Sequence, residues 1–540
     1  MNDLSLDEKV GQLFSIGARG IFLAESSAEF QRLLHHVRDN HVGGFIWFVS
    51  NVYETALLNA RLQAASRVPL LMSADLEAGI GMRFTDTTFW PSAMAVAATG
   101  DPSFAEQAAR VVAREARALG INHILAPVAD VNVDPANPVI NTRSFGENPA
   151  EVSRYVTAFI RGVQGEGVLA TAKHFPGHGD THIDSHRSLP LLDVSAERLE
   201  RVELVPFRAA IAAGVASIMI GHLSVPAIDP TPAPVRAFGH GENPYGTAAG
   251  EVPRGGTLPA TVSSKIVDGL LRRTLGFDGL VVSDAFDMGG ITEHFDAGEA
   301  AVRAIEAGED QILLSPNPDA AIAAVKAAVN SGRLSVGRID ESVRRILAAK
   351  RFAGVPHASA DEIFRTIDSK EHRDLAAEIA RRAVTLVRNE RDALPLSSGT
   401  RVLLAIVSDV PEPNPLPDFE REVRRRARVV RAALLDAGTH DDELPPPGDA
   451  EAALIAFAIR ARSGAGRIAV PAVARRFVES LAANVPVIAV SFGTPYLIRE
   501  LPAHSTVLGA YGIQPVMQIA AVQAIFGEER MTGRLPVTVV

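Results

Sequence analysis

Eight short apolar runs, separated by helical patterns, recur through the first 350 residues of the chain. Amphipathic stretches such as Phe104–Leu119, Ala150–Glu166 and Ile266–Leu275 lie between the runs. Repeated strand–helix units pair their strands in parallel and place the helices outside, so eight units over this length predict a (β/α)8 TIM-like barrel. The predicted strands are Val10–Ile16, Gly44–Phe48, Leu70–Ala74, Ile121–Val128, Ala170–His174, Ala216–Gly221, Leu280–Ser283 and Gln311–Leu314.

A second alternating pattern occupies the rest of the 540 residues. Helical stretches such as Ala472–Ala482 and Val516–Phe526 separate apolar strands there, which is typical of a three-layer α/β/α sandwich. The basic run Arg421–Arg431 fits one solvated helix face. The predicted strands are Val384–Val387, Val402–Val407, Leu454–Ala458, Val487–Ser491 and Val507–Ala510. We therefore expect an α/β protein with a catalytic barrel over residues 1–350, a helical linker over 351–375 and a C-terminal α/β/α sandwich over 376–540.

Composition narrows the chemistry and the partners of the chain. The absence of cysteine excludes a disulfide framework, a thiolate nucleophile and a thiolate metal site. A net charge of −10 gives no general attraction to nucleic acid or to an anionic membrane. Residues Met1–Phe14 lack the apolar core of a signal peptide, and no apolar run reaches the roughly 20 residues that span a bilayer. We expect a cytoplasmic protein, or a secreted one whose leader has been removed, that is a monomer or a homodimer.

Polar residues stand where several of the barrel strands are predicted to end. They are Asp75, Asp130, His174, His222 and Asp284. Barrel enzymes place their chemistry at the C-terminal ends of the strands, so these residues mark the expected position of a site. Polar residues can also simply mark where a strand meets water, but that explanation suits one or two positions better than a cluster.

The segment from Lys173 to His186, KHFPGHGDTHIDSH, holds four of the 15 histidines of the chain. Its alternating imidazole and carboxylate groups, from His178 onward, are good zinc ligands. Without a metal, Asp184 and His186 share one face of an extended segment, so that the carboxylate can orient the imidazole and stabilise its protonated form for acid–base catalysis. The residues alone leave both interpretations open.

Other candidate residues are ambiguous when they are taken singly. Asp284 can act as a nucleophile toward an anomeric carbon, although an isolated aspartate at a strand end more often caps a helix. Asp75 and Arg83 can grip sugar hydroxyls through paired hydrogen bonds, or can form a structural ion pair. Arg143, in the run NTRSFG, fits a ligand clamp and a surface loop equally.

Together, these clusters resemble the two-domain β-N-acetylglucosaminidases of glycoside hydrolase family 3. The signature of that subgroup is the run Lys173–Asp180, followed by Asp184-Ser185-His186 and Leu189-Pro190. The resemblance spans nearly the whole chain, because it also includes Asp75–Arg83, Pro127–Asp130, Asn141–Gly146, Gly279–Met288 and Gly533–Val537.

The resemblance implies a role for each matching residue. Asp284 is then the nucleophile that forms a covalent glycosyl-enzyme intermediate, and His186 is the general acid and later the general base, with Asp184 as its partner. The implied ligands of the sugar in the cleavage subsite are Asp75, Arg83, Arg143, Lys173 and His174. The family uses no metal and no other cofactor, which favours the metal-free interpretation and leaves His178, Asp180 and His182 as loop-shaping residues or secondary contacts.

The implied reaction is retaining hydrolysis of terminal β-linked N-acetylglucosamine, from peptidoglycan fragments or chitooligosaccharides. Imidazole, with an ordinary pKa of about 6.5, suits the exchange of a proton near neutral pH. Three residues depart from the family pattern: Ala78 replaces a usual glycine, Ile80 a common arginine and Ala285 a common acidic residue. These departures put the substrate preference in doubt more than the catalysis.

Three other functions remain open. A histidine in place of a second carboxylate lets phosphate approach without like-charge repulsion, so the scaffold also suits a β-N-acetylglucosaminide phosphorylase. The histidine-rich segment also suits a zinc-dependent hydrolase. The third alternative is a non-catalytic sugar-binding protein, against which the intact set of Asp284, Asp184 and His186 argues.

Overall fold

The computed structural model describes residues 3–236, 256–356, 358–461 and 468–539. The chain divides into two compact units. The first unit comprises Met1–Thr88, Glu106–Val131 and Pro149–Ser369, and the second comprises Phe89–Ala105, Asn132–Asn148 and Lys370–Val540. Two short segments from the first third of the chain thus belong to the same unit as the C-terminal part. Among the described residues, no helix is both long enough and apolar enough to cross a membrane.

Eight parallel strands form a closed barrel in the first unit, in the order of the sequence. They are β1 Phe14–Ala18, β2 Gly44–Trp47, β3 Leu71–Ala74, β4 His123–Ile124, β5 Leu169–Phe175, β6 Ser217–Ile220, β7 Leu280–Ala285 and β8 Gln311–Leu313. The barrel closes where Phe14 and Ser15 of β1 pair with Ile312 and Leu313 of β8. The predicted (β/α)8 barrel is confirmed.

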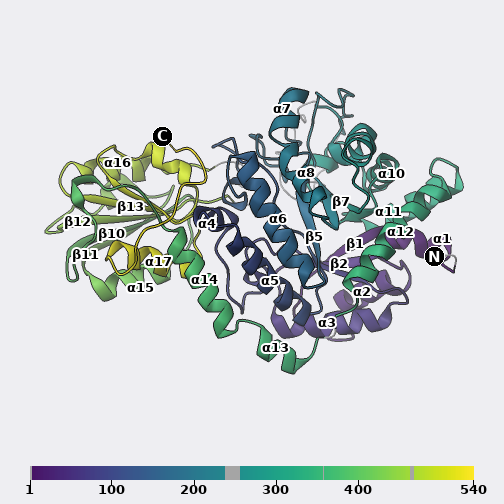
Figure 1. Cartoon of the computed structure of the whole chain (residues 1–540), viewed down its shortest axis with the longest axis horizontal. Coiled ribbons are helices and arrows are strands. Elements are labelled where there is room, and N and C mark those ends of the chain that lie inside the picture. The colour runs from purple at the N-terminus through teal and green to yellow at the C-terminus, as the bar shows by residue number, and fades with distance from the viewer. Residues whose placement is uncertain (1–2, 237–255, 357, 462–467, 540) are drawn as a thin grey trace. The chain divides into compact units, whose positions relative to one another are not determined.

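Helices surround these strands and form the outer layer of the barrel (Figure 1). The major ones are α2 Ala28–Arg38, α3 Val52–Ala65, α5 Ser103–Ala118, α6 Pro149–Gly165, α8 Leu204–Ala212, α10 Ala297–Ala307, α11 Pro318–Asn330 and α12 Val336–Ala353, with the π-helix η4 Lys265–Thr274. Side-chain oxygens of Ser27, Asp296 and Asn317 accept backbone N–H bonds at the starts of α2, α10 and α11. Such caps satisfy donors that the first helical turn leaves without partners.

Two of the predicted barrel strands are wrong in extent. The first was expected to begin at Val10, but Val10 lies in helix α1 (Leu6–Gln12), because Ser5 and Glu8 form a capping box that starts a helix. The fourth was expected over residues 121–128, but β4 covers two residues before the chain reaches Pro127, which has no N–H to continue a strand ladder.

The second unit contains a six-stranded sheet in the order β11-β10-β12-β13-β14-β9, in which β9 is antiparallel to β14. The strands are β9 Thr385–Arg388, β10 Arg401–Ser408, β11 Arg428–Leu435, β12 Ala452–Ala458, β13 Val487–Ser491 and β14 Thr506–Gly509. Helix α16 (Ala472–Ala482) covers one face, and α14 (Lys370–Ala383), α15 (Pro417–Arg426) and α17 (Pro515–Ile525) cover the other (Figure 1). The predicted α/β/α sandwich is confirmed.

The edge strand β11 was not predicted from the sequence. The basic run Arg421–Arg431 was interpreted as one helix face, but α15 ends at Arg426 and β11 begins at Arg428. Most side chains of β11 are partly or fully exposed, so the strand lacks the continuous apolar run of a buried one. Charged side chains on an edge strand also discourage pairing with another chain.

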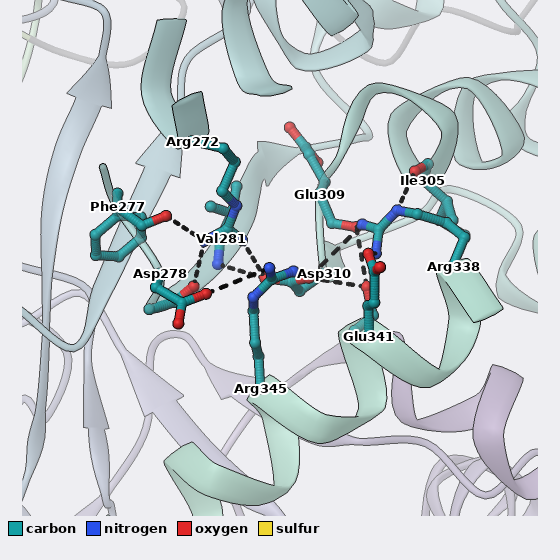
Figure 2. Close-up of polar contacts among 12 residues, drawn as sticks. Arg272, Phe277, Asp278, Val281, Ile305, Glu309, Asp310, Arg338, Glu341 and Arg345 are labelled. Carbon is teal, nitrogen blue, oxygen red and sulfur yellow. Dashed lines mark hydrogen bonds and ion pairs between the residues drawn. The ribbon is translucent and has the colours of Figure 1, made fainter. Parts of the chain in front are cut away.

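A buried aspartate fastens α12 to the amino-terminal ends of β7 and β8 (Figure 2). Asp310 is fully buried, and its Oδ2 accepts bonds from Arg272 Nη2 at 2.6 Å and from the backbone N–H of Val281 at 3.0 Å. Its Oδ1 accepts bonds from Ser342 Oγ at 2.9 Å and Arg345 Nη1 at 3.2 Å. The carboxylate therefore links three separate segments of the first unit at the barrel end opposite to the predicted site.

We expect Asp310→Asn to lower the free energy of unfolding by about 3–5 kcal/mol, because the buried guanidinium of Arg272 then loses its charge partner. Chemical denaturation followed by circular dichroism measures this change. The matched control is Asp278→Asn, since Asp278 contacts Arg345 at 3.4 Å but its side chain is 93% exposed, and its loss should change stability by less than about 0.5 kcal/mol. Equal effects of the two substitutions would contradict the assignment.

Candidate active site

Three strands of the barrel carry half of the eight predicted site residues at their carboxyl ends. Asp75 directly follows β3, Lys173 and His174 lie in β5, and Asp284 lies in β7. Because the parallel strands of a barrel all end at the same face, these side chains gather there. Lys173 contacts Asp75, and the imidazole of His174 acts electrostatically on Asp284, so the structure brings these residues together.

Asp75 is the centre of an ion-pair network. Its Oδ1 accepts a bond from Lys173 Nζ at 2.7 Å, and its Oδ2 accepts one from Arg83 Nη2 at 2.5 Å. Lys173 is almost fully buried and also pairs with Glu77 Oε1 at 2.7 Å. Burial opposes the charge of Asp75, but the two cations outweigh it and hold the pKa of this carboxyl far below its usual range. The network therefore presents a fixed, ionised carboxylate.

Asp130 positions the next residue of β5. It is fully buried, and its Oδ2 bonds to His174 Nδ1 at 2.8 Å. Its Oδ1 accepts the backbone N–H bonds of His174 at 3.2 Å and of His178 at 2.7 Å. A carboxylate on Nδ1 fixes both the orientation of the ring and its tautomer. One aspartate therefore orients the imidazole and also holds the start of the following loop.

Asp184 and His186 form the predicted pair. His186 donates from Nδ1 to Asp184 Oδ1 at 2.8 Å, and its backbone N–H donates to the same oxygen at 2.9 Å. The side chain of Asp184 is fully buried, whereas that of His186 is 20% exposed. Since Nδ1 is occupied by the carboxylate, Nε2 is the ring nitrogen that can exchange a proton with a ligand.

The loop that carries His186 is bonded to the segment that follows Asp284. The backbone N–H of Gly289 donates to His186 O, and that of Gly290 donates to Ser185 O, each at 3.0 Å. Gly289 and Gly290 begin the short helix α9 (Gly289–Thr292). The charge of His186 also contributes to the pKa of Asp284. The candidate acid–base residue and the candidate nucleophile are thus attached to one stretch of backbone.

The other polar residues of the histidine-rich loop have separate partners. His178 is buried between Thr181 Oγ1, at 2.8 Å from Nδ1, and Ser185 Oγ, at 3.1 Å from Nε2. Burial lowers the pKa of His178 to about 4, so its imidazole is neutral at neutral pH. Asp180 pairs instead with Arg198 at 3.1 Å. These contacts brace the loop, and they direct His178 and Asp180 away from a shared metal ion.

Imidazoles keep Asp284 ionised. Burial would raise the pKa of this carboxyl, but His174, His222, the backbone N–H of Ala285 and His186 together outweigh burial and lower it. The Ala285 N–H donates to Asp284 Oδ1 at 2.8 Å. A partly buried carboxylate that remains charged at a strand end has the properties of a nucleophile.

Two neighbours of Asp284 received no role from the sequence. His222 is fully buried, bonds from Nδ1 to Thr261 Oγ1 at 3.0 Å and donates from Nε2 to Ala285 O at 2.8 Å. Asp287 is partly buried, and burial, with the charge of Asp284, raises its pKa. The position of His222 directly after a predicted strand indicated that it could lie near the site, whereas no sequence pattern distinguished Asp287 from an ordinary loop residue.

Arg143 belongs to the second unit. It ends the 3₁₀ helix Asn141–Arg143, and its Nη1 donates to Val139 O at 3.1 Å. Its role as a sugar ligand stays a prediction. Among the three departures from the family pattern, Ile80 is fully buried and starts a 3₁₀ helix between Asp75 and Arg83, so an apolar side chain fills this position.

Comparisons with known proteins identify the family. Residues 5–349 match the glycosyl hydrolase family 3 N-terminal domain. A β-N-acetylglucosaminidase/β-glucosidase from Cellulomonas fimi is 32% identical over an alignment that covers 99% of this chain and 94% of the relative.

Solved structures agree with this match. The family 3 β-N-acetylglucosaminidase from Paenibacillus sp. str. FPU-7 superposes with a TM-score of 0.84 at 33% identity, over 99% of each chain. The β-glucoside phosphorylase BglX bound to 2FGlc superposes with a TM-score of 0.86 at 26% identity, over 100% of this chain and 95% of its own.

The close approach at Gly289 predicts a measurable effect on the loop. A Cβ at this position would lie 2.3 Å from Arg187 O, so Gly289→Ala must push the loop away. We expect trypsin to cut after Arg187 roughly tenfold faster in Gly289→Ala than in the wild type, as measured from the rate of appearance of that fragment by mass spectrometry. Gly337→Ala is the control, because the nearest atom to its added Cβ is 3.8 Å away. Unchanged cleavage in Gly289→Ala would contradict the anchoring role.

Proposed function

The chain belongs to glycoside hydrolase family 3, and we propose that it is a retaining exo-β-N-acetylglucosaminidase. The observation that carries the proposal is the hydrogen-bonded pair of Asp184 and His186, whose loop is bonded to the segment directly after Asp284. A retaining glycosidase needs a nucleophile and a proton donor near the same sugar, and the attachment of both candidates to one backbone segment supports this role. The activities for which the Cellulomonas and Paenibacillus relatives are named agree with this substrate class.

The first half of the proposed reaction forms a covalent intermediate. The carboxylate of Asp284 attacks the anomeric carbon while the bond from that carbon to the leaving oxygen breaks. His186 gives the leaving oxygen a proton from Nε2. Before this step, the charge of Asp184 stabilises the protonated imidazole, to which it is bonded at 2.8 Å.

The second half releases the sugar. His186 takes a proton from water at Nε2, and the water oxygen attacks the anomeric carbon as its ester bond to Asp284 breaks. Two displacements at the same carbon return the β configuration. The free enzyme is restored, with the proton from water on the imidazole.

We propose that Asp75, Lys173, Arg83 and His174 hold the hydroxyl groups of the terminal sugar. Asp75 is fixed by two cations, so it can accept hydroxyl hydrogen bonds without moving during the reaction. We further propose that the natural substrates are peptidoglycan fragments or chitooligosaccharides, since both carry terminal β-linked N-acetylglucosamine.

One observation favours phosphorolysis as a second candidate reaction. The structural neighbour BglX is named a β-glucoside phosphorylase. Imidazole as the acid–base group adds no negative charge where an anionic acceptor would approach the intermediate, so phosphate is not repelled as it would be by a carboxylate.

A panel of aryl β-glycosides tests the proposal. With N-acetylglucosamine, glucose and xylose as the sugars, we expect turnover to be highest for N-acetylglucosamine. We expect the first product seen by proton NMR to be the β-anomer of the free sugar. We also expect the turnover rate to be the same with and without 10 mM phosphate, a concentration about ten times the upper end of typical KM values. A sugar 1-phosphate as the main product would establish the phosphorylase instead, and an α-anomer would exclude the retaining mechanism.

Removal of the acid–base imidazole should depend on the leaving group. We expect His186→Ala to lose roughly 10²–10⁴-fold in kcat/KM on alkyl or sugar glycosides, and far less on a dinitrophenyl glycoside, which needs no proton on its leaving oxygen. Azide should restore turnover of the latter by attacking the intermediate without a base. His182→Ala is the matched control, because His182 is an exposed histidine on the same loop. Equal losses on both kinds of substrate would contradict the role of His186.

A further inference from the structure

Two histidines near the end of α2 and an aspartate in the first turn of α11 hold metal-type ligand atoms close together. His35, His36 and Asp319 each offer one such atom, and these three atoms lie within 4.8 Å of one another. His36 is almost fully buried, whereas His35 and Asp319 are exposed. The proposed glycosidase reaction uses none of the three residues, so any function of this group is separate from that reaction.

The side-chain amide of Asn40 marks the point where the three ligand atoms meet. Its Nδ2 lies 2.6 Å from Asp319 Oδ1, 3.0 Å from His36 Nδ1 and 3.4 Å from His35 Nε2. An amide nitrogen has two hydrogens, yet three atoms that can accept a bond surround it. A cation here takes the place of the amide nitrogen and lies about 2.0–2.2 Å from the nitrogen of the buried His36, so the exposed side chains of His35 and Asp319 move inward to reach it.

A second carboxylate supports the ring of His35. Asp39 Oδ2 lies 2.8 Å from His35 Nδ1, while the Nε2 of the same ring faces Asp319 at 3.0 Å. Histidines that bind metal ions almost always donate their other ring N–H to a carboxylate or a carbonyl, which fixes the tautomer and increases the basicity of the ligand nitrogen. Asp39 is such a carboxylate for His35, because it accepts the hydrogen bond from the ring nitrogen that would not bind the metal ion.

We propose that His35, His36 and Asp319 bind a Zn²⁺ ion. Two imidazoles and one carboxylate suit zinc, whereas Mg²⁺ and Ca²⁺ prefer sets made of oxygen. Although the two histidines are adjacent in the sequence, they reach a common point because His35 uses its distal nitrogen and His36 its proximal one. Water completes the tetrahedron around the ion.

Bound zinc would link the two sides of the seam of the barrel. Helix α2 follows β1 and helix α11 follows β8, and the pairing of these two strands closes the ring. An ion that joins residues of α2 and α11 binds the folded barrel and not the unfolded chain, so it stabilises the fold by mass action. The proposed site is therefore structural, and its test does not depend on the glycosidase assignment.

The experiment uses the full chain after treatment with a chelator. Titration with ZnCl₂ against a competing fluorescent zinc indicator should show one tight site per chain. Thermal unfolding with excess zinc should occur about 2–6 °C higher than with the chelator.

Variants place the site on these residues. His35→Ala and Asp319→Asn change exposed side chains, and each should weaken zinc binding at least tenfold and remove the thermal shift. Asn40→Asp places a carboxylate at the meeting point, and should tighten binding. The control is His504→Ala, which removes an exposed histidine from the second unit and should change neither measurement.

Two results would overturn the proposal. One is a wild-type chain that binds no zinc at micromolar concentrations. The other is tight binding that His35→Ala and Asp319→Asn leave unchanged, which would place the metal elsewhere, for example in the loop that holds His178 and His182. Circular dichroism of each variant shows that the fold is retained, so a loss of binding reports on the ligands.

Discussion

The pairing of β1 with β8 closes the ring of parallel strands, and this closure determines where the candidate residues on the barrel strands lie. In a closed parallel ring, all strands end at one face, so residues distant in the sequence, such as Asp75 and Asp284, are carried to the same place. The opposite end is used for stability. There, Asp310 joins Arg272 and α12 to the beginnings of β7 and β8. The candidate site residues thus lie at one end of the barrel, and the Asp310 contacts that stabilise the barrel lie at the other.

Charge balance explains how so many polar groups are buried at one face. Asp75 and Glu77 are opposed by Lys173 and Arg83, so this network brings two charges of each sign. Burial lowers the pKa values of His178 and His222, which favours their neutral forms and limits the cost of removing them from water. What remains is an ionised carboxylate on β7 and the Asp184–His186 pair on the adjacent loop, which are the groups that the proposed chemistry requires.

The sequence predicted the repeated strand–helix units of the fold, but it did not predict the edge strand, the capped first helix or the polar contacts that depend on tertiary structure. The eight apolar runs predict the barrel because buried parallel strands read as continuous apolar segments. The edge strand β11 carries exposed arginines and gives no such signal, and the capped helix α1 was mistaken for part of β1. The histidine-rich loop was recognised from its composition, but the separate partners of His178 and Asp180, which are Thr181 on the same loop and Arg198 further along the chain, were not predicted, because spacing alone does not show which polar groups pair. The group formed by His35, His36 and Asp319 joins residues nearly 300 positions apart, beyond the reach of any spacing rule.

The hydrogen bonds of Gly289 and Gly290 to the His186 loop connect the proposed acid–base residue to the segment that follows the proposed nucleophile. A general acid on a separate loop must be placed to a fraction of an ångström relative to the nucleophile, and a loop held by solvent-exposed contacts would not achieve this. Here the backbone carbonyls of Ser185 and His186 are bonded to amides five and six residues beyond Asp284. The position of His186 relative to Asp284 is therefore coupled to the backbone of residues 284–290 as well as to β5, from which the loop begins. Glycine is required at positions 289 and 290 because a Cβ on either residue would lie within 3 Å of a neighbouring atom. The proposed chemistry therefore depends on two residues that have no side chain.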